Sequence, residues 1–206
     1  MARIDVLTGL NRPATRSTVL ALLGALALGL SVGSPAVVAQ DESKSANTQV
    51  AAIVRLDGEI DELTERTLEM RVARALAMNP RFVIISIESP GGAYEASRSI
   101  AWNLKELQKQ RTDLHVAAFI RGNALSGATI VAFGCEFIAV SPSAQLGDSM
   151  PIFTGALAPK VAEKFISPVR KDLEQLAMES GYPIDVAGAM VDPSIELHRI
   201  EVKDKA

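Results

Sequence analysis

A lone serine among small residues is the position of this chain best suited to nucleophilic chemistry. Ser126 lies within residues 122–128, where an apolar strand pattern runs directly into a wholly apolar helix pattern. A serine hydroxyl attacks a carbonyl once a base removes its proton, and the resulting oxyanion needs hydrogen-bond donors already in place. Gly127 and Ala128 leave room for a substrate, and the Gly127 N–H at a helix start has no acceptor within the helix. The alternative, which spacing alone favours, is that Ser126 merely caps the helix.

The turn Ser89-Pro90-Gly91-Gly92 is the natural complement of this serine. It ends one apolar run and opens a helical pattern, and two glycines there let the main chain approach a ligand closely. Taken alone, a tight turn is the simpler interpretation. Both junctions should follow neighbouring parallel strands at one edge of a sheet, where open α/β sheets bind ligands. The pair therefore predicts a serine hydrolase site.

The base that would activate Ser126 is predicted to be a lysine. The two histidines, His115 and His198, fall at the start of a strand and in the polar C-terminal tail, so a Ser-His triad is not expected. A lysine can serve as the base when burial lowers its pKa by disfavouring the charged ammonium. The predicted helix 160–179 carries Lys160, Lys164 and Lys171. Lys164 borders the apolar stripe of that helix and is the leading candidate, and the alternative is a solvated lysine on an amphipathic helix.

The elements that must position these residues alternate between strand and helix. Apolar runs bounded by turn residues predict strands at 50–56, 82–87, 114–120 and 136–140. Helical spacing predicts helices at 61–77, 93–110, 124–133 and 160–179, separated in the last case by a loop at 141–151. The order predicts an α/β fold around a mainly parallel sheet, and the continuous apolar runs are typical of parallel strands buried on both faces.

Three of these helices carry specific expectations. Asp61 is expected to cap the first helix. The helix at 93–110 should pack on the sheet through the apolar stripe of Ala96, Ile100, Leu104 and Leu107. Its opposite side, expected to face water, carries Arg98, Lys105 and Lys109. Pro168 is expected to kink or split the helix at 160–179.

The N-terminal part of the chain is predicted to be a targeting segment rather than part of the fold. In residues 1–39, arginines precede the apolar run 19–30 and a small-residue cleavage site follows, which is typical of a secretory signal. An uncleaved membrane anchor is the alternative, but this run is shorter than the roughly 20 residues of a spanning helix. Residues 40–49 are polar and predict a linker. The domain is therefore expected at 50–206, exported to a periplasmic or other extracytoplasmic compartment.

Composition excludes several function classes. The chain has 206 residues, a net charge of −3 and a single cysteine, so no internal disulfide is possible. It has no basic run or interleaved aromatic pattern, which argues against a nucleic-acid surface. No His, Cys and carboxylate cluster has the spacing of metal ligands, so no metal or cofactor is implied.

From about residue 50 to residue 197, the chain resembles the N-terminal protease domain of NfeD-type membrane-bound serine proteases. These are relatives of the Clp protease proteolytic subunit and of signal peptide peptidase A. The motifs that carry the resemblance follow in order: Asp57-Gly58-Glu59-Ile60, Ser89-Pro90-Gly91-Gly92, Ala124-Leu125-Ser126, residues 144–151 and Glu163-Lys164. The resemblance implies a Clp/crotonase-like spiral of β-α units around the sheet.

The resemblance also implies roles for individual residues. Ser126 would be the nucleophile and Lys164 the general base of a Ser-Lys dyad. The amides of Gly92 and Gly127 would form the oxyanion hole, with Gly91 lining the substrate groove. The implied partners are a membrane surface, further copies of the chain in a homo-oligomer, and an apolar peptide such as part of a stomatin-like membrane protein.

The chain departs from the family pattern in three places. It has Ser126-Gly127-Ala128 where the family usually has Ser-Ala-Gly, and Glu136 where an aspartate is usual. The family typically continues into a membrane segment and a small β-barrel domain, so this chain is expected to be a fragment or a shortened relative. Two other functions stay open: a catalytically silent domain that binds apolar segments, and an acyl-transfer or thioesterase activity on the same scaffold.

Overall fold

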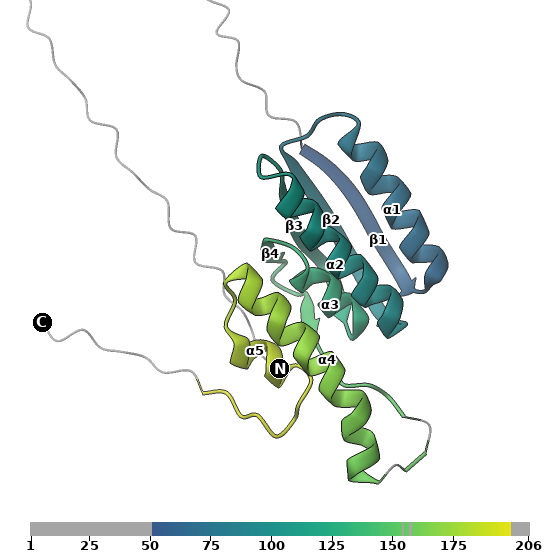
Figure 1. Cartoon of the computed structure of the whole chain (residues 1–206), viewed down its shortest axis with the longest axis vertical. Coiled ribbons are helices and arrows are strands. Elements are labelled where there is room, and N and C mark those ends of the chain that lie inside the picture. Colours follow the sequence, from purple (N-terminus) through teal and green to yellow (C-terminus); the bar gives the residue numbers. More distant parts are fainter. Residues whose placement is uncertain (1–50, 154, 157, 199–206) are drawn as a thin grey trace, which may run out of the picture. The chain divides into compact units, whose positions relative to one another are not determined.

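The computed structural model describes residues 51–153, 155–156 and 158–198 of the chain (Figure 1). The predicted signal at 1–39 and linker at 40–49 lie outside these residues. The strands are β1 (Ala51–Ile60), β2 (Phe82–Gly92), β3 (His115–Leu125), β4 (Phe137–Val140) and β5 (Gln145–Gly147). The helices are α1 (Glu62–Leu76), α2 (Tyr94–Gln110), α3 (Gly127–Phe133), α4 (Pro159–Ser180) and α5 (Ile184–Ala189).

The strands form one parallel sheet in the order β1-β2-β3-β4, and β5 pairs with the end of β3. This confirms the predicted alternation and the mainly parallel sheet. β2 and β3 run further than predicted, because each continues past a register shift and pairs again. The extension sets Ser89 opposite Ala124, so the two junctions chosen from the sequence lie on adjacent strands. It also moves the start of the third helix from the predicted residue 124 to Gly127, and β5 falls inside the predicted loop.

Local sequence signals account for the first two helices. The Asp61 carboxylate accepts a hydrogen bond of 2.7 Å from the Thr64 N–H, so this residue caps α1 as predicted. The apolar stripe of α2 packs on the sheet as predicted. Lys105 on the same helix does not face water as predicted. It is 6% exposed, because the C-terminal end of α4 packs beside it and Ser180 Oγ accepts its hydrogen bond.

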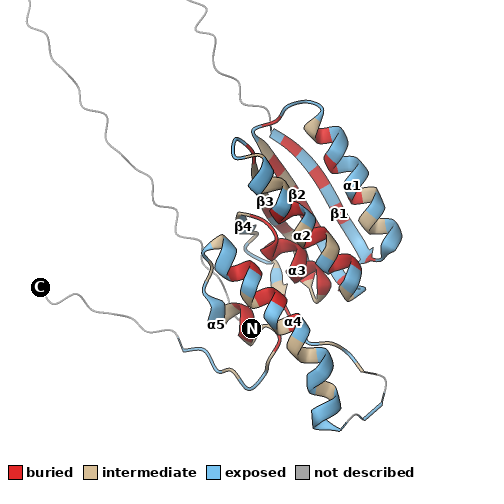
Figure 2. Ribbon diagram, viewed as in Figure 1, coloured by how far each residue is buried: buried red, intermediate tan, exposed pale blue. Residues whose placement is uncertain are grey.

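The helices α1, α2 and α3 all pack on one face of the sheet, where the buried side chains of β1, β2 and β3 form the main core. Burial alternates along β1, as Figure 2 shows. Side chains on the opposite face are open: Ile53 is 69% exposed and Phe137 is 52% exposed. The prediction of burial on both faces was made for β2 and β3. It is wrong for β3, where Phe119 is 39% exposed, because no helix of the described residues covers the second face.

The two halves of the long helix α4 differ in burial, although the helix itself is unbroken. It is continuous through Pro168, so the split that the sequence led us to expect at this proline does not occur. Its second half, from Val169 through Leu173 to Leu176, is buried in a second core cluster with α3 and α5. In the first half, Phe165 is 54% exposed, and the ribbon there extends away from the sheet (Figures 1 and 2). No helix of the described residues has the length and apolar character needed to cross a membrane.

Candidate active site

Ser126 stands on a strained turn between β3 and α3. Its backbone has φ 51° and ψ −124°, a conformation that residues with a side chain rarely adopt. Its N–H donates a 3.0 Å hydrogen bond to the Gly147 carbonyl. The Ser126 side chain makes no capping hydrogen bond to α3. The capping interpretation is therefore wrong, and strain of this kind persists where surrounding contacts hold it, often at active sites.

Two hydroxyl side chains that the sequence did not single out hold this turn. The buried Thr129 Oγ1 lies 2.8 Å from the carbonyls of both Ala124 and Gly147, and it accepts a 3.1 Å bond from the Gly147 N–H. Since a hydroxyl has one proton, it donates to one of these carbonyls at a time. Ser149 Oγ donates to the Ser126 carbonyl at 3.2 Å. Thr129 thus ties the turn to β3 through Ala124 and to β5 through Gly147.

Gly91 packs directly against the serine turn. A Cβ added at Gly91 would lie 2.5 Å from the Leu125 carbonyl oxygen and 2.6 Å from Ser126 Cβ. Its φ of 97° is also one that favours glycine. Gly91 thus approaches the backbone of the Ser126 turn itself, and the close approach to a ligand expected of the Gly91-Gly92 pair stays a prediction.

The two proposed oxyanion donors also lie close together. A Cβ added at Gly127 would lie 3.5 Å from the Gly92 nitrogen and would collide with Ser97 Oγ. Ser97 is buried and donates to the Ala93 carbonyl at 2.9 Å, so it is fixed in place. An alanine at position 127, which the family usually has, would therefore force the Ser97 hydroxyl to move away and give up its bond to Ala93.

These residues line one cleft with a volume of about 460 Å³. Its polar lining includes Glu59, Ser126 and Ser149. Its apolar lining comes from four segments of the chain: Pro90, Ile130, Pro151, Ile152 and Val169. Ser126, Gly91, Gly92 and Gly127 all contribute to it, so the structure brings together every predicted site residue except the lysine. Within the described ranges, no group of His, Cys, Asp or Glu is arranged to bind a metal ion.

The lysines of α4 stand apart from this arrangement. Lys160, Lys164 and Lys171 are exposed, and none of them lines the cleft. Among the described residues, no lysine makes a hydrogen bond to Ser126. α4 reaches the cleft through Val169, which lies about 7.5 Å further along the helix than Lys164, at about 1.5 Å per residue.

A polar cluster ties α2 to α4 beside the cleft. Tyr94, which lines the cleft, donates through its hydroxyl to Asp172 Oδ2 at 2.6 Å. Arg98 Nε donates to the same oxygen at 2.7 Å. Burial and the bond to Asp172 raise the pKa of Tyr94 well above its ordinary value, so its hydroxyl stays protonated. The cluster fixes α4 close to where Val169 enters the cleft wall.

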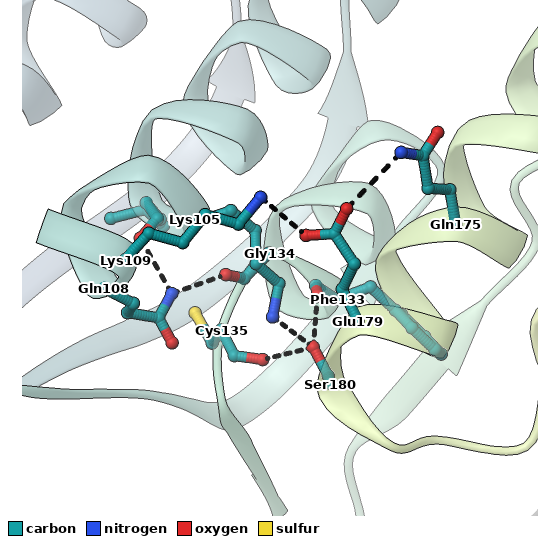
Figure 3. Close-up of polar contacts among 10 residues, drawn as sticks. Lys105, Gln108, Lys109, Phe133, Gly134, Cys135, Gln175, Glu179 and Ser180 are labelled. Atoms are coloured by element: carbon teal, nitrogen blue, oxygen red, sulfur yellow. Dashed lines mark hydrogen bonds and ion pairs between the residues drawn. The ribbon is translucent and has the colours of Figure 1, made fainter. Parts of the chain in front are cut away.

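A second cluster holds the other end of α3 (Figure 3). Lys105 donates to Ser180 Oγ, which lies 3.3 Å from the Phe133 carbonyl and 3.2 Å from the Cys135 carbonyl. Burial lowers the pKa of Lys105 and raises that of the Cys135 thiol to about 12. Lys105 is therefore a buried lysine of the kind expected for a base, but it lies at the end of α3 opposite Ser126.

Solved structures of two proteins share this fold. The membrane-bound stomatin-specific protease 1510-N superposes with a TM-score of 0.60 at 22% identity, over 70% of each chain. A structure of that protease with a substrate peptide gives a TM-score of 0.60 at 21% identity, over 70% of this chain and 67% of the other. ClpP1 from Listeria monocytogenes gives 0.51 at 16% identity, over 68% and 78% of the two chains. The predicted Clp-like fold is thereby confirmed.

Sequence comparison identifies the family. Membrane-bound protease PH1510 of Pyrococcus horikoshii is 24% identical over 156 residues, which are 72% of this chain and 34% of that protein. The chain thus spans about a third of the length of this curated relative. Residues 50–206 match the family described as NfeD1b, N-terminal domain. The predicted resemblance is confirmed, and this chain belongs to the NfeD1b N-terminal domain family.

Proposed function

We propose that this chain is an exported serine peptidase that cleaves apolar segments of membrane-associated proteins with a Ser-Lys dyad. Ser126 Oγ attacks the peptide carbonyl while Lys164 takes the hydroxyl proton. The amides of Gly92 and Gly127 donate to the oxyanion, and Lys164 returns the proton to the leaving amine. Water then hydrolyses the acyl-enzyme and restores the serine.

The single observation that carries this proposal is the state of Ser126. Its side chain lines a cleft, its backbone is strained, and its hydroxyl makes no capping bond to the helix that it precedes. A serine that merely capped the start of a helix would use its hydroxyl in a capping bond, whereas a nucleophile needs a free hydroxyl beside preorganised amides. The close packing of Gly91 on the turn supports the same role.

Support for the substrate class comes from the cleft and from the relatives. Five of the side chains that line the cleft are apolar: Pro90, Ile130, Pro151, Ile152 and Val169. A relative with this fold carries the name of a membrane-bound protease specific for stomatin. A stomatin-like membrane protein is therefore the substrate that we propose, and a membrane surface is the place of action.

Support for Lys164 comes from the motif Glu163-Lys164 and from its helix. α4 contributes Val169 to the cleft wall, and its first half, which carries Lys164, contacts the core only through the partly buried Ile166. We propose that this half moves toward Ser126 when substrate binds. Catalytic hydrogen bonds often form only in the substrate complex, so an exposed lysine in the free protein is compatible with the role of base.

Cleavage of an apolar peptide by the purified protein tests the proposal. We expect Ser126→Ala to lower kcat/KM by about 1000-fold or more. Lys164→Ala should lower it by roughly 100-fold or more, whereas the matched variants Lys160→Ala and Lys171→Ala should cleave at the wild-type rate. Equal rates for wild type and Ser126→Ala would refute the nucleophile, and loss in Lys171→Ala alone would reassign the base.

The exposure of Lys164 favours a second candidate, a silent domain that holds an apolar segment in the same cleft. In that case the wild-type protein binds the peptide without cleaving it, and Ser126→Ala and Lys164→Ala leave binding unchanged. Replacement of an exposed cleft side chain, such as Ile152→Glu, should then weaken or abolish binding. Incubation with a coenzyme A thioester tests the thioesterase alternative, because turnover that depends on Ser126 would place the chemistry on a different acyl group.

A further inference from the structure

The cleft beside Ser126 carries an acidic side chain and no basic one. Glu59 lines it, whereas no lysine, arginine or histidine of the described residues does. Tyr94 is the other ionisable group of the lining, and the raised pKa of its hydroxyl keeps it neutral. The cleft therefore carries a negative charge that its own lining does not balance.

Glu59 differs from the two carboxylates that precede it along the sheet. Asp57 pairs with Glu88 across β1 and β2, and Arg121 of β3 forms ion pairs with both, at 2.7 Å for Glu88. The register of β1 shifts after Asp57, so Glu59 pairs with Gly91 instead. Within the described ranges, the Glu59 carboxylate has no ion pair or hydrogen bond of its own. A bound substrate can supply the opposite charge.

The backbone at Glu59 is fixed beside the reaction centre. Its carbonyl accepts a 3.0 Å hydrogen bond from Thr64 Oγ1. Paired strands lie about 5 Å apart, so Glu59 stands one strand spacing from Gly91, and a Cβ added at Gly91 would lie 2.6 Å from Ser126 Cβ. An extended peptide advances about 3.3 Å per residue. A side chain within about three residues of the bond that Ser126 attacks can therefore reach the carboxylate.

The rest of the lining determines which side chain can make this contact. Apolar side chains line much of the remaining cleft, among them Pro90 and Ile152. Lysine and arginine combine a long apolar stem with a cationic head, so the stem can lie on such a surface while the head bonds to a carboxylate. An acidic residue in the same place would meet a like charge. The lining thus fits an apolar segment that contains one basic residue.

We propose that Glu59 is a specificity-determining residue that selects substrates with a lysine or arginine side chain close to the scissile bond. The segment is otherwise apolar, and its basic head pairs with the Glu59 carboxylate. The inference rests on the proposed function for the position of the scissile bond. It narrows the substrate class from apolar segments to apolar segments that carry one positive charge.

Binding to the Ser126→Ala protein tests the charge preference without any cleavage. The probes are short, labelled apolar peptides in which one residue is lysine, Nε-acetyl-lysine or glutamate and is moved through successive positions. Acetylation keeps the stem and removes the charge. At the best position, we expect the lysine peptide to bind roughly 5-fold more tightly than the acetyl-lysine peptide at low salt, the size of an exposed ion pair. The glutamate peptide should bind most weakly, and high salt should reduce the difference by screening.

Variants of Glu59 tie the preference to this side chain. Glu59→Gln keeps the size and removes the charge, so the lysine and acetyl-lysine peptides should bind equally well. Glu59→Lys should invert the order and favour the glutamate peptide. Glu62→Gln is the matched control, because it changes the net charge equally while its side chain is 89% exposed and does not line the cleft. This control should keep the preference for lysine.

Cleavage by the wild-type chain gives the second readout. We measure kcat/KM for the same peptides and locate the cleaved bonds by mass spectrometry. The lysine peptide should exceed the acetyl-lysine peptide by roughly 5-fold, and this ratio should disappear in Glu59→Gln. A merely structural role of Glu59 would lower kcat/KM for all peptides alike and leave the ratio unchanged.

Three outcomes would overturn the inference. One is equal binding of the three peptides by the Ser126→Ala protein, and another is a preference for lysine that persists in Glu59→Gln. The third is an equal loss for every peptide in that variant, which would make Glu59 a partner of a group of the chain itself, such as Lys164.

Failure of the proposed function would look different. If the lysine peptide binds most tightly and no peptide is cleaved, the peptidase activity is wrong and the charge preference stands. If all peptides are cleaved at one rate, the peptidase activity stands and the charge preference is wrong.

Discussion

The Ser126 side of the cleft and the α4 side differ in how much of the protein holds them. Ser126 is fixed by its own strained turn, by bonds from Thr129 and Ser149 to neighbouring carbonyls, and by Gly91 packed behind it. On the α4 side, the helix is fully buried in the core only from Val169 onward, and in its first half Ile166 is partly buried against that core.

The difference separates what is preorganised from what can move. Oxyanion donors must be in place before charge develops, because reorienting dipoles during the reaction costs free energy. A base carried on a long side chain needs to reach its target only when substrate is bound. A rigid nucleophile turn opposite a largely exposed half-helix is therefore a workable division of roles.

The largest effect on activity should follow from displacing the rigid turn that carries Ser126. Gly91→Ala would force a Cβ to within 2.5 Å of the Leu125 carbonyl oxygen, and backbone cannot yield as a side chain can. We expect kcat/KM to fall by about 100-fold, as a displacement of the turn by about 1 Å would cause. Gly181→Ala is the control, since its φ is also positive but no atom lies within 4 Å of an added Cβ. Equal activity of the two variants would mean that Gly91 does not set the turn.

The buried and the exposed half of α4 should contribute differently to the free energy of unfolding. Leu173→Ala removes a fully buried side chain and is expected to lower the free energy of unfolding by about 2–5 kcal/mol. Phe165→Ala, on the exposed half, should cost less than about 0.5 kcal/mol. Urea denaturation measures both. A loss of several kcal/mol for Phe165→Ala would mean that the first half of α4 is packed in solution.

The hydroxyl that holds the nucleophile turn should contribute less than a core side chain. Thr129→Val keeps the shape but leaves the Gly147 N–H without its acceptor, so we expect a loss of about 1–3 kcal/mol. Thr129→Ser keeps the hydroxyl and should retain more of the stability and activity. If Val were tolerated and Ser were not, the methyl group rather than the bond would hold the turn.

The smallest effect is the pH dependence of the free energy of unfolding that comes from Lys105, at the end of α3 away from Ser126. Because burial lowers the pKa of Lys105 in the folded protein, the unfolded chain binds more protons below the ordinary value of 10.5. The free energy of unfolding should therefore rise with pH as that value is approached, by at most about 1.4 kcal/mol per pH unit. Lys105→Met should lack this rise. The groups that face Lys105 are Cys135, Glu179, Glu136 and Lys109, and a variant with the wild-type slope would attribute the rise to them.

Much of the fold could be predicted because its signals are local. Apolar periodicity located every strand except β5 and every helix except α5. The Asp61 cap and the stripe of α2 needed only neighbouring residues. The glycine pair and Ser126 were predicted as partners because parallel strands bring their carboxyl ends together.

Other features depended on partners far along the chain. The strand β5 has three residues, too few for a periodic pattern, and it exists because β3 runs on to pair with it. Lys105 has the spacing of an exposed residue but is buried by the end of α4. The open face of the sheet could not be predicted either, because an apolar run has the same pattern whether its second face is covered or open.

By itself, the sequence determined the alternation of strands and helices, the parallel order, and the choice of Ser126 with Gly91 and Gly92, since periodicity and backbone freedom are properties of neighbouring residues. Tertiary structure alone decided that the Ser126 side chain does not cap its helix, that a side chain at position 127 would displace Ser97 Oγ, that the first half of α4 is largely exposed, and that one face of the sheet is open. Burial, collision and hydrogen-bond satisfaction depend on which distant segments meet, and only the folded chain brings those segments together.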